Sequence, residues 1–577
     1  MMCTSVDVAC HEELDVPTSL ISDDGEGRRP MEKIFHYRSL CDRVRSGDRS
    51  ANSQFVFAGV FMNLFSVRLA LLVYLCGSAL MFSGCASLPP RPEVPYEQAL
   101  APAESGPIAG LAERFAADHG AQASGFHLLI DAHEALETRL ALIDSATVSI
   151  DLQYFIWKGD GVGLLLFDRL LQAADRGVRV RIIVDDIWLG SSTRNLAALN
   201  SHPNLEIRIF NPNPSRDSTL GGFINYLASF QALNQRMHNK LMIVDNQAIV
   251  VGGRNLGNEY FGLGDEFNFL DVDVVAVGGV VEESSNAYDD YWNDNAVYPL
   301  TRWMAGLPDN TLEEVRRAVA ELVGDVQQQL VSYSLEPRDW RPWFEGVEQD
   351  LLIGTAHFLQ DDPVQIDGKG YRLVDMISYF ASPTKEELLL TSPYLIPVEK
   401  SLEDLQLEVE KGVRVHLLTN SLASTNHTLV SSHYKKYRRP ILATGAQLYE
   451  FRHQPSGTVR NWADVAPVKA PFISLHAKVI VADRRLCFIG SLNFDPRAIV
   501  INSENGLLID SPDLARELAG FVELLTEPEN SWRLTIGKGN RMFWESSEKM
   551  LDAQPARGGF QSFVDLFGSL LPIESQL

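Results

Sequence analysis

The stretch HNKLMIVD at residues 238–245 returns as HAKVIVAD at residues 476–483. Both copies have the spacing His-x-Lys-x-x-x-x-Asp. At matching offsets, both are followed by a pair of small residues and an asparagine: Gly252, Gly253 and Asn255, then Gly490, Ser491 and Asn493. One copy would be weak evidence, because its residue types are common. Two copies, each followed by an apolar run, indicate an internal duplication.

Each copy has the pattern of a β-strand that presents its His and Lys on one face. Side chains two residues apart in a strand point the same way, so each His–Lys pair is aimed at a single site. Asp245 and Asp483 fall at the turn that follows. We expect these aspartates to tie down the turn, or to receive a lysine contact, rather than to touch substrate.

The flanking sequence repeats as well. Periodicity predicts helices over residues 135–145, 161–174, 311–332 and 402–410, and strands over 148–156, 178–184, 388–390 and 413–418. The tetrapeptide Gly-Val-Arg-Val joins helix to strand in both halves, at 177–180 and 412–415. Alternating strands and helices predict an α/β fold with largely parallel or mixed sheets. Residues 337–346 are predicted to cross between the halves, with a boundary near residue 345.

With these motifs the chain resembles the phospholipase D superfamily, whose signature is this duplicated motif. Within it, the chain is similar to bacterial cardiolipin synthases of the C type. The segments LQYFIW at 152–157, GRN at 253–255, NEYF at 258–261 and TNSLASTN at 419–426 carry this resemblance further. It extends from about Gly125 to the C-terminus and implies two α/β lobes, packed face to face, that each supply half of one site.

The candidate catalytic residues are the six motif residues, His238, Lys240, Asp245, His476, Lys478 and Asp483. One histidine would attack phosphorus to form a phosphohistidine, and the other would protonate the leaving oxygen and then deprotonate the incoming alcohol. The resemblance favours His238 as the nucleophile. Both lysines, the amides of Asn255 and Asn493 and the Ser491 hydroxyl are candidates for holding the phosphate oxygens. We expect no metal and no cofactor.

Each histidine also needs an acceptor for its other ring nitrogen. The family pattern implies an acidic residue a few strands further along the chain. Glu504 fits His476, and Asp271 is the matching position for His238. Because the chain has an insertion near Asp271, Asp273 and Glu266 remain alternatives. The other histidines, His427 and His433 among them, are interpreted as ordinary.

The N-terminal region predicts a membrane anchor. Residues 1–61 are polar and mixed in charge, and are expected to be a non-native or disordered extension from an upstream start. Residues 62–84 are mostly apolar and end in Ser83-Gly84 before Cys85, which resembles a lipoprotein signal with Cys85 as the lipidated residue. An uncleaved transmembrane anchor is the alternative. Either way, the lobes at 85–345 and 346–577 would lie on the periplasmic side, tied to a membrane.

Charge and cysteine content narrow the function. The formal net charge is −25, and residues 85–577 contain 65 acidic and 42 basic side chains. Nucleic-acid enzymes usually have a basic surface, so we expect no nucleic-acid partner. Cys487 is the single cysteine after Cys85, lies in an apolar run, and is expected to be a buried free thiol.

The predicted function is a phosphatidyltransferase that makes cardiolipin from phosphatidylglycerol and a donor phospholipid. The C-type resemblance suggests phosphatidylethanolamine as the donor. A hydrolase of the same fold (a phospholipase D or phosphodiesterase, or a nuclease, which the acidic charge and the lipid anchor disfavour) is the alternative. A non-catalytic lipid-binding lipoprotein is the third hypothesis.

Two surface features remain open. The basic run Lys435, Lys436, Arg438 and Arg439 has the pattern of a solvated face, with an anionic lipid headgroup as the alternative contact. The C-terminal apolar stretch is expected to pack into the core, with membrane contact as the alternative; it contains Phe560, Phe563, Val564, Phe567, Leu570 and Leu571.

Overall fold

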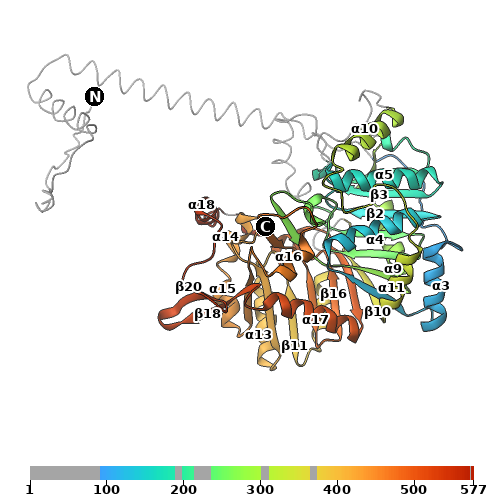
Figure 1. Ribbon diagram of the computed structural model, residues 1–577. Helices are drawn as coiled ribbons and strands as arrows, with labels where there is room; N and C mark the ends of the chain where they lie inside the picture. Colours follow the sequence, from blue (N-terminus) through green and yellow to red (C-terminus); the bar gives the residue numbers. More distant parts are fainter. Residues whose placement is uncertain are drawn as a thin grey trace, which may run out of the picture. The chain divides into compact units, whose positions relative to one another are not determined.

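The computed structural model describes residues 91–188, 198–212, 235–300, 311–363, 373–571 and 573–576. These residues belong to one compact unit (Figure 1). Cys85 and the apolar run before it lie outside the described residues. No helix in the described ranges has both the length and the apolar character needed to cross a membrane.

The first half of this unit is a mixed eight-stranded half-sheet. The neighbours β2, β3 and β4 run parallel to one another, and the other pairings are antiparallel. From one edge the order is β9 (Val297–Pro299), β4 (Leu205–Phe210), β3 (Arg179–Asp185), β2 (Ser149–Tyr154), β5 (Lys240–Val244), β6 (Ala248–Gly252), β8 (Asp273–Gly278) and β1 (Ser124–Leu129).

The second half repeats this order strand for strand, with β11, β12 and β13 as its parallel neighbours. The sequence is β18 (Ser531–Gly537), β13 (Gln447–Phe451), β12 (Arg414–Asn420), β11 (Glu387–Thr391), β15 (Val479–Ala482), β16 (Leu486–Gly490), β17 (Asn505–Asp510) and β10 (Leu352–Gln360). A ribbon of β19 (Arg541–Glu545) and β20 (Met550–Leu551) extends it beyond β18.

Strand β10 joins the two half-sheets. Its first residues, 352–354, pair with β1, and residues 355–360 pair with β17. The strands therefore form one continuous mixed sheet, which the sequence pattern did not predict. Two further strands, β7 (Phe267–Leu270) and β14 (Phe472–Leu475), pair with each other in a separate parallel ribbon.

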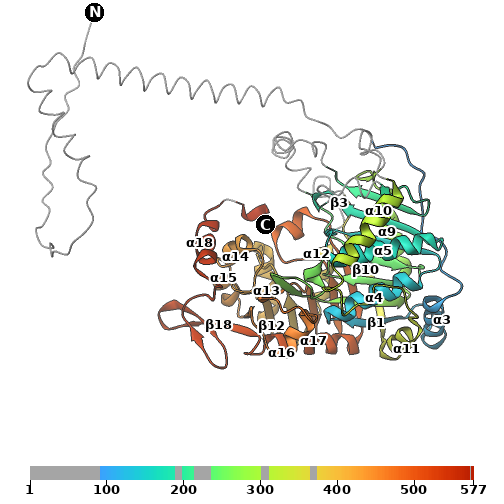
Figure 2. The same ribbon diagram turned by 45° about the horizontal axis from the view of Figure 1, so that its top comes forward.

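Helices cover both faces of this sheet (Figure 2). The helices are α3 (Pro107–His119), α4 (Ala132–Ser145), α5 (Gly161–Asp175), α9 (Val280–Asn293), α10 (Leu312–Asp325), α11 (Arg341–Asp350), α12 (Leu373–Ala381), α13 (Glu399–Glu410), α14 (Thr428–Tyr434), α15 (Arg438–Ala443), α16 (Gly457–Ala463), α17 (Pro512–Thr526) and α18 (Gly559–Gly568). Helices α4 and α5 close an apolar core on one side of the first half-sheet. Helices α9 and α17 contribute to a second core that also takes in side chains from both half-sheets. Burial of this common apolar surface holds the halves together.

The α/β fold and the internal duplication are confirmed. The end of one helix differs from the sequence prediction, whereas the domain boundary stays a prediction. The helix predicted over 311–332 begins after a capping box in which Thr311 and Glu314 bind each other's backbone N–H groups. It ends at Asp325, seven residues earlier than predicted. The predicted boundary near residue 345 falls inside α11.

The motif aspartates hold the ends of their hairpins. The Asp245 carboxylate accepts hydrogen bonds from the backbone N–H groups of Thr147, Val148 and Ser149 at 2.7–3.1 Å, and from the Thr147 hydroxyl. The Asp483 carboxylate accepts from the N–H groups of residues 385–387 at 2.8–3.0 Å. Each aspartate thus fastens its hairpin to the start of the neighbouring strand, β2 or β11.

The backbone at these turns is left-handed. Asp245 and Asn246 have φ of 55° and 51°, and Asp483 and Arg484 both have φ of 51°. Two successive positive φ values define the tight turn that best fits the twist of a β-hairpin. Asparagine and aspartate tolerate this conformation better than most residues.

We expect Asp245→Ala to lower the free energy of unfolding by about 3 kcal/mol, because it leaves one buried and two partly buried N–H groups without their acceptor. Asp483→Ala should cost about half as much, since its partners are more exposed. Shifts in the urea midpoint measure both effects, with the exposed Asp118→Ala as the control expected to stay within about 0.5 kcal/mol. Equal midpoints for all three variants would contradict this role.

Candidate active site

The two motif histidines are each paired with a carboxylate from the opposite half of the chain. His238 Nδ1 lies 2.8 Å from Glu504 Oε2, and His476 Nδ1 lies 2.5 Å from Asp271 Oδ2. Both carboxylates are fully buried. The sequence prediction of the pairing was wrong, because it sought each acid within the histidine's own half. The alternative Asp273 instead forms an ion pair with Arg139 at 2.8 Å.

Backbone pairing between the halves explains the crossing. Strand β14 pairs in parallel with β7, so Leu475 lies opposite Leu270, and the His476 N–H donates to the Leu270 carbonyl at 2.7 Å. In the symmetric place, Met237 pairs with Ser503, and the His238 N–H donates to the Ser503 carbonyl at 2.9 Å. In both halves, the residue just before the histidine therefore pairs with the residue just before the acid of the other half. This pairing places the imidazole ring beside that acid.

Two equivalent residues, missed in the sequence, hold these crossing segments. Asp185, the last residue of β3, accepts from the Met237 N–H at 3.0 Å. Asn420, the last residue of β12, accepts from the Leu475 N–H at 3.0 Å and donates to the Leu475 carbonyl at 2.8 Å. The available signal was their position: both end a strand that begins with the repeated Gly-Val-Arg-Val segment, and sites in open α/β sheets gather at the carboxyl ends of strands.

The motif lysines lie beside the histidines and are almost fully buried. Each Nζ donates to the backbone carbonyl of the histidine two residues earlier, at 2.5 Å for Lys240 and His238. An ammonium group has three N–H donors, so each lysine can also bind a phosphate oxygen.

Burial controls the protonation of these groups. Desolvation lowers the pKa of both histidines well below the ordinary range, and the charges of Lys240 and Lys478 lower it further. Desolvation also lowers the pKa of Lys240, and lowers that of Lys478 to about 8 despite the nearby carboxylates. With Nδ1–H directed to a carboxylate, a neutral imidazole presents an unprotonated Nε2, the form needed for attack on phosphorus.

Aromatic rings fix the imidazole planes. His476 packs against Phe269, with ring centroids 4.5 Å apart, and against Tyr260 at 5.3 Å. His238 packs edge-on against Phe155 at 5.1 Å. These rings limit rotation of the histidines about their side-chain bonds. His427, interpreted as ordinary from sequence, lies close enough for its charge to lower the pKa of His476.

The candidate phosphate ligands differ between the halves. Asn255 accepts from the Ile156 N–H at 3.1 Å and donates to the Tyr260 hydroxyl at 3.0 Å, which leaves one amide N–H for substrate. Within the described chain, Asn493 Oδ1 is buried without a hydrogen-bond partner. The Ser491 hydroxyl donates to Glu504 at 2.5 Å. Its predicted role is therefore corrected: Ser491 positions the carboxylate of Glu504 rather than a phosphate oxygen.

Comparison with known proteins assigns the family. Residues 140–291 and 377–524, together more than half of the chain, match the family described as "Cardiolipin synthase, PLD-like domain". The chain belongs to the phospholipase D superfamily. The match falls once in each half, in agreement with the duplicated fold.

Named relatives include cardiolipin synthase C of Escherichia coli K12, which is 33% identical over 451 residues, 76% of this chain and 93% of that protein. An uncharacterized protein of Helicobacter pylori J99 is 34% identical over 428 residues, 73% of this chain and 82% of its own length. The major cardiolipin synthase ClsA of Bacillus subtilis 168 is 26% identical over 399 residues, 68% of this chain and 66% of that protein.

The first half has Gly253 at the position equivalent to Ser491. A steric contact explains why this position holds a glycine. A Cβ added to Gly253 would lie 2.1 Å from Asp271 Oδ1, a distance that real atoms do not adopt. The first half therefore combines Gly253 with Asp271, and the second combines Ser491 with Glu504. The missing hydroxyl makes room for a carboxylate.

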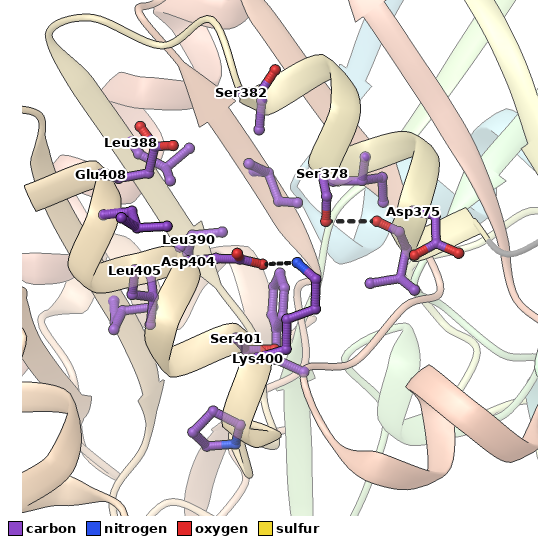
Figure 3. Close-up of a pocket in the computed structure, with 18 of the residues that line it drawn as sticks. Asp375, Ser378, Ser382, Leu388, Leu390, Lys400, Ser401, Asp404, Leu405 and Glu408 are labelled. Atoms are coloured by element: carbon purple, nitrogen blue, oxygen red, sulfur yellow. Dashed lines mark hydrogen bonds and ion pairs between the residues drawn. The ribbon is translucent and has the colours of Figure 1, made fainter. Parts of the chain in front are cut away.

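A separate groove of about 560 Å³ lies in the second half between α12 and α13 (Figure 3). Leu388 and Leu390 of β11 form part of its wall, and Lys400 and Asp404 pair across 2.6 Å at its rim. None of the six motif residues is among its described lining residues. We therefore assign the chemistry to the histidine pair and not to this groove.

We expect Gly253→Ala to reduce kcat by about 100-fold or more, because the added methyl displaces Asp271 from His476, and small misplacements of catalytic groups have effects of this size. Gly520→Ala is the matched control, since a Cβ there meets nothing within 4 Å. Turnover of both purified variants, with circular dichroism to verify folding, provides the measurement. A folded Gly253→Ala variant within twofold of wild type would refute the steric argument.

The pH dependence of kcat/KM should reflect the protonation of Lys478. Below its pKa of about 8 the ammonium is charged and can bind phosphate, and this charge is lost as the pH rises through that value. We expect kcat/KM to fall above about pH 8. In Lys478→Arg the part of the fall near pH 8 should disappear, because a guanidinium stays protonated. Burial also lowers the pKa of Lys240, so a fall that belongs to Lys240 should remain in this variant. An unchanged alkaline limb in Lys478→Arg would assign the titration to another group.

Proposed function

We propose that this chain is a membrane-bound phosphatidyltransferase that makes cardiolipin from phosphatidylglycerol and a donor phospholipid. The observation that carries the proposal is the pair of buried histidines, each oriented by a carboxylate of the other half and accompanied by a lysine. This arrangement supplies a nucleophile, an acid–base group and two cations, which together suffice for a two-step transfer at phosphorus. Kinship with proteins named cardiolipin synthase supports a phospholipid substrate.

In the first step, His238 Nε2 attacks the phosphorus of the donor lipid. The negative charge of the bound phosphodiester favours proton uptake by His476, whose pKa is low in the empty site. The phosphorus–nitrogen bond forms as the bond to the headgroup oxygen breaks, and His476 transfers this proton to that oxygen. Glu504 and Asp271 hold the imidazoles through Nδ1 and stabilise each ring when it is positively charged. Lys240 and Lys478 offset the charge that builds up on the phosphate oxygens.

In the second step, a hydroxyl of phosphatidylglycerol attacks the phosphohistidine. His476, now neutral, takes the hydroxyl proton, the phosphorus–nitrogen bond breaks, and cardiolipin leaves. Each histidine then has its original protonation state. The family resemblance supports His238 as the nucleophile and phosphatidylethanolamine as the donor lipid.

Burial favours transfer over hydrolysis. His238 and His476 are only 8% and 4% exposed, so few water molecules can reach the intermediate. A lipid alcohol held at the site then competes with water at a high effective concentration. Hydrolysis to phosphatidic acid is the alternative second step.

The proposal includes the location of the enzyme. A lipoprotein-type anchor at Cys85 would place the catalytic lobes at the periplasmic face of a membrane, beside their lipid substrates. Mass spectrometry of the mature protein tests this part separately: a lipid-modified N-terminal Cys85 supports it, and retention of residues 62–84 contradicts it.

A product assay tests the function. The enzyme is incubated with labelled phosphatidylglycerol in mixed micelles, with and without phosphatidylethanolamine, and the lipids are identified by mass spectrometry. We expect cardiolipin, and at least a 1,000-fold loss in His238→Ala and in His476→Ala, because each removes a group used in both steps. His416→Ala, at a histidine of β12, is the control that retains activity. Phosphatidic acid without cardiolipin would identify a phospholipase D, and full activity of both motif variants would refute either enzyme.

A further inference from the structure

Helix α18, near the C-terminus, has its apolar side outward and its polar side inward. Six large apolar side chains of residues 559–571 are exposed: Phe560 82%, Phe563 57%, Leu566 61%, Phe567 52%, Leu570 75% and Leu571 46%. On the opposite side, Gln561 and Asp565 are buried. A surface helix of a soluble protein normally has the reverse arrangement. The expectation that this stretch packs into the core was therefore wrong for these side chains.

The polar side of α18 is firmly bound to the second lobe, so the outward apolar side is a fixed surface. Gln561 donates to the Leu422 carbonyl at 2.5 Å, and Asp565 forms a 2.8 Å ion pair with Lys435 of the segment after α14. His433 contacts the Gly568 carbonyl at 3.2 Å. Both views show α18 beside α14 at the margin of the lobe (Figures 1 and 2).

The surroundings of α18 are basic, although the chain is strongly acidic. Residues 428–443 contain four basic side chains and no acidic one, and residues 557–577 add one basic and two acidic side chains. Within the described segments Lys435 and Lys436 are partly exposed, and each is paired with an acid of the C-terminal segment. Arg438 is buried and paired with Glu450, so it adds nothing to the surface charge. The remaining side chains still give a positive local net charge, which attracts anionic lipid headgroups.

We propose that the apolar face of α18 inserts into the interface of a bilayer that contains anionic phospholipid. The outward face of α18 carries three phenylalanines and Leu566, and Leu570 and Leu571 follow just after the helix. Such apolar side chains beside basic ones are the composition of helices that lie in the membrane surface. Exposed to water, this apolar area would be unfavourable, whereas insertion into the acyl boundary buries it. The inference rests on the proposed function in one respect, namely that the substrate is a membrane lipid.

The helix is also coupled to the catalytic site. Gln561 and Arg557 bind the carbonyls of Leu422, Ala423 and Thr425. This loop directly follows Asn420, which holds Leu475 next to His476. Insertion of α18 therefore brings the segment next to His476 to the membrane surface, where a phospholipid headgroup can enter without leaving the bilayer completely.

The test uses the full chain reconstituted in vesicles of phosphatidylglycerol and phosphatidylethanolamine. Phe563→Ser/Phe567→Ser removes the centre of the apolar face without touching the buried side. The matched control is Leu322→Ser/Val331→Ser, two exposed apolar side chains in and after α10 of the first lobe. We expect the α18 variant to turn over bilayer lipid at least tenfold more slowly. It should retain its rate on short-chain phospholipid dispersed as monomers, and the control should match wild type in both assays.

Fluorescence separates insertion from other uses of the face. In Phe563→Trp, the additional tryptophan emission should be quenched by lipids brominated in the upper acyl chain, and in Val331→Trp it should not. Absence of quenching at position 563, or equal bilayer rates in the α18 and control variants, overturns the inference. If there is no quenching at position 563 and the protein is a dimer that Phe563→Ser/Phe567→Ser dissociates, the apolar face of α18 binds a second copy of the chain instead of a membrane. If wild type turns over neither lipid form while position 563 is quenched, the proposed function fails and the membrane contact stands.

Discussion

Two hydrogen bonds between imidazole and carboxylate cross from one half of the chain to the other, and the catalytic centre depends on them. His238 is oriented by Glu504 and His476 by Asp271. The bonds follow from pairing of the backbone just before each histidine with the backbone just before the opposite acid. Removing water from ionisable groups is costly unless they are paired, and these pairs satisfy the buried carboxylates. The common core between α9 and α17 and the continuous sheet through β10 provide the rigid support that such short contacts need.

Much of the fold and part of the site could be predicted from the sequence. Local apolar patterns located α4, α5, β2, β3, β11 and β12, and the repeated Gly-Val-Arg-Val segment marked the starts of β3 and β12. The duplicated motif identified both histidines and lysines, and the turn positions of Asp245 and Asp483 followed from strand geometry. Asp271 and Glu504 were found as acids through the family pattern, which implies an acidic residue a few strands after each histidine.

The remaining features depend on contacts between distant parts of the chain. The backbone pairing between the halves decides which histidine each acid contacts. Periodicity within one half contains no information about that pairing. The same holds for β10, whose nine residues pair with two different strands. The role of Ser491 was misassigned because a serine near a phosphate site suggests a ligand, whereas its hydroxyl is bound to Glu504. The outward face of α18 has an apolar period that a core helix would share, so the pattern alone could not tell which side would be covered.

The crossed arrangement also affects the order in which the enzyme becomes competent during synthesis. When the first half has emerged from the ribosome, His238 and Asp271 are present, but neither has its partner. His476 appears 205 residues after Asp271, and the acid that orients His238 is made 266 residues after that histidine. A growing chain therefore has no complete catalytic pair until most of its length exists, and no pair for His238 until residue 504. The crossed pairing thus makes the complete pair of oriented histidines one of the last features of the chain to form.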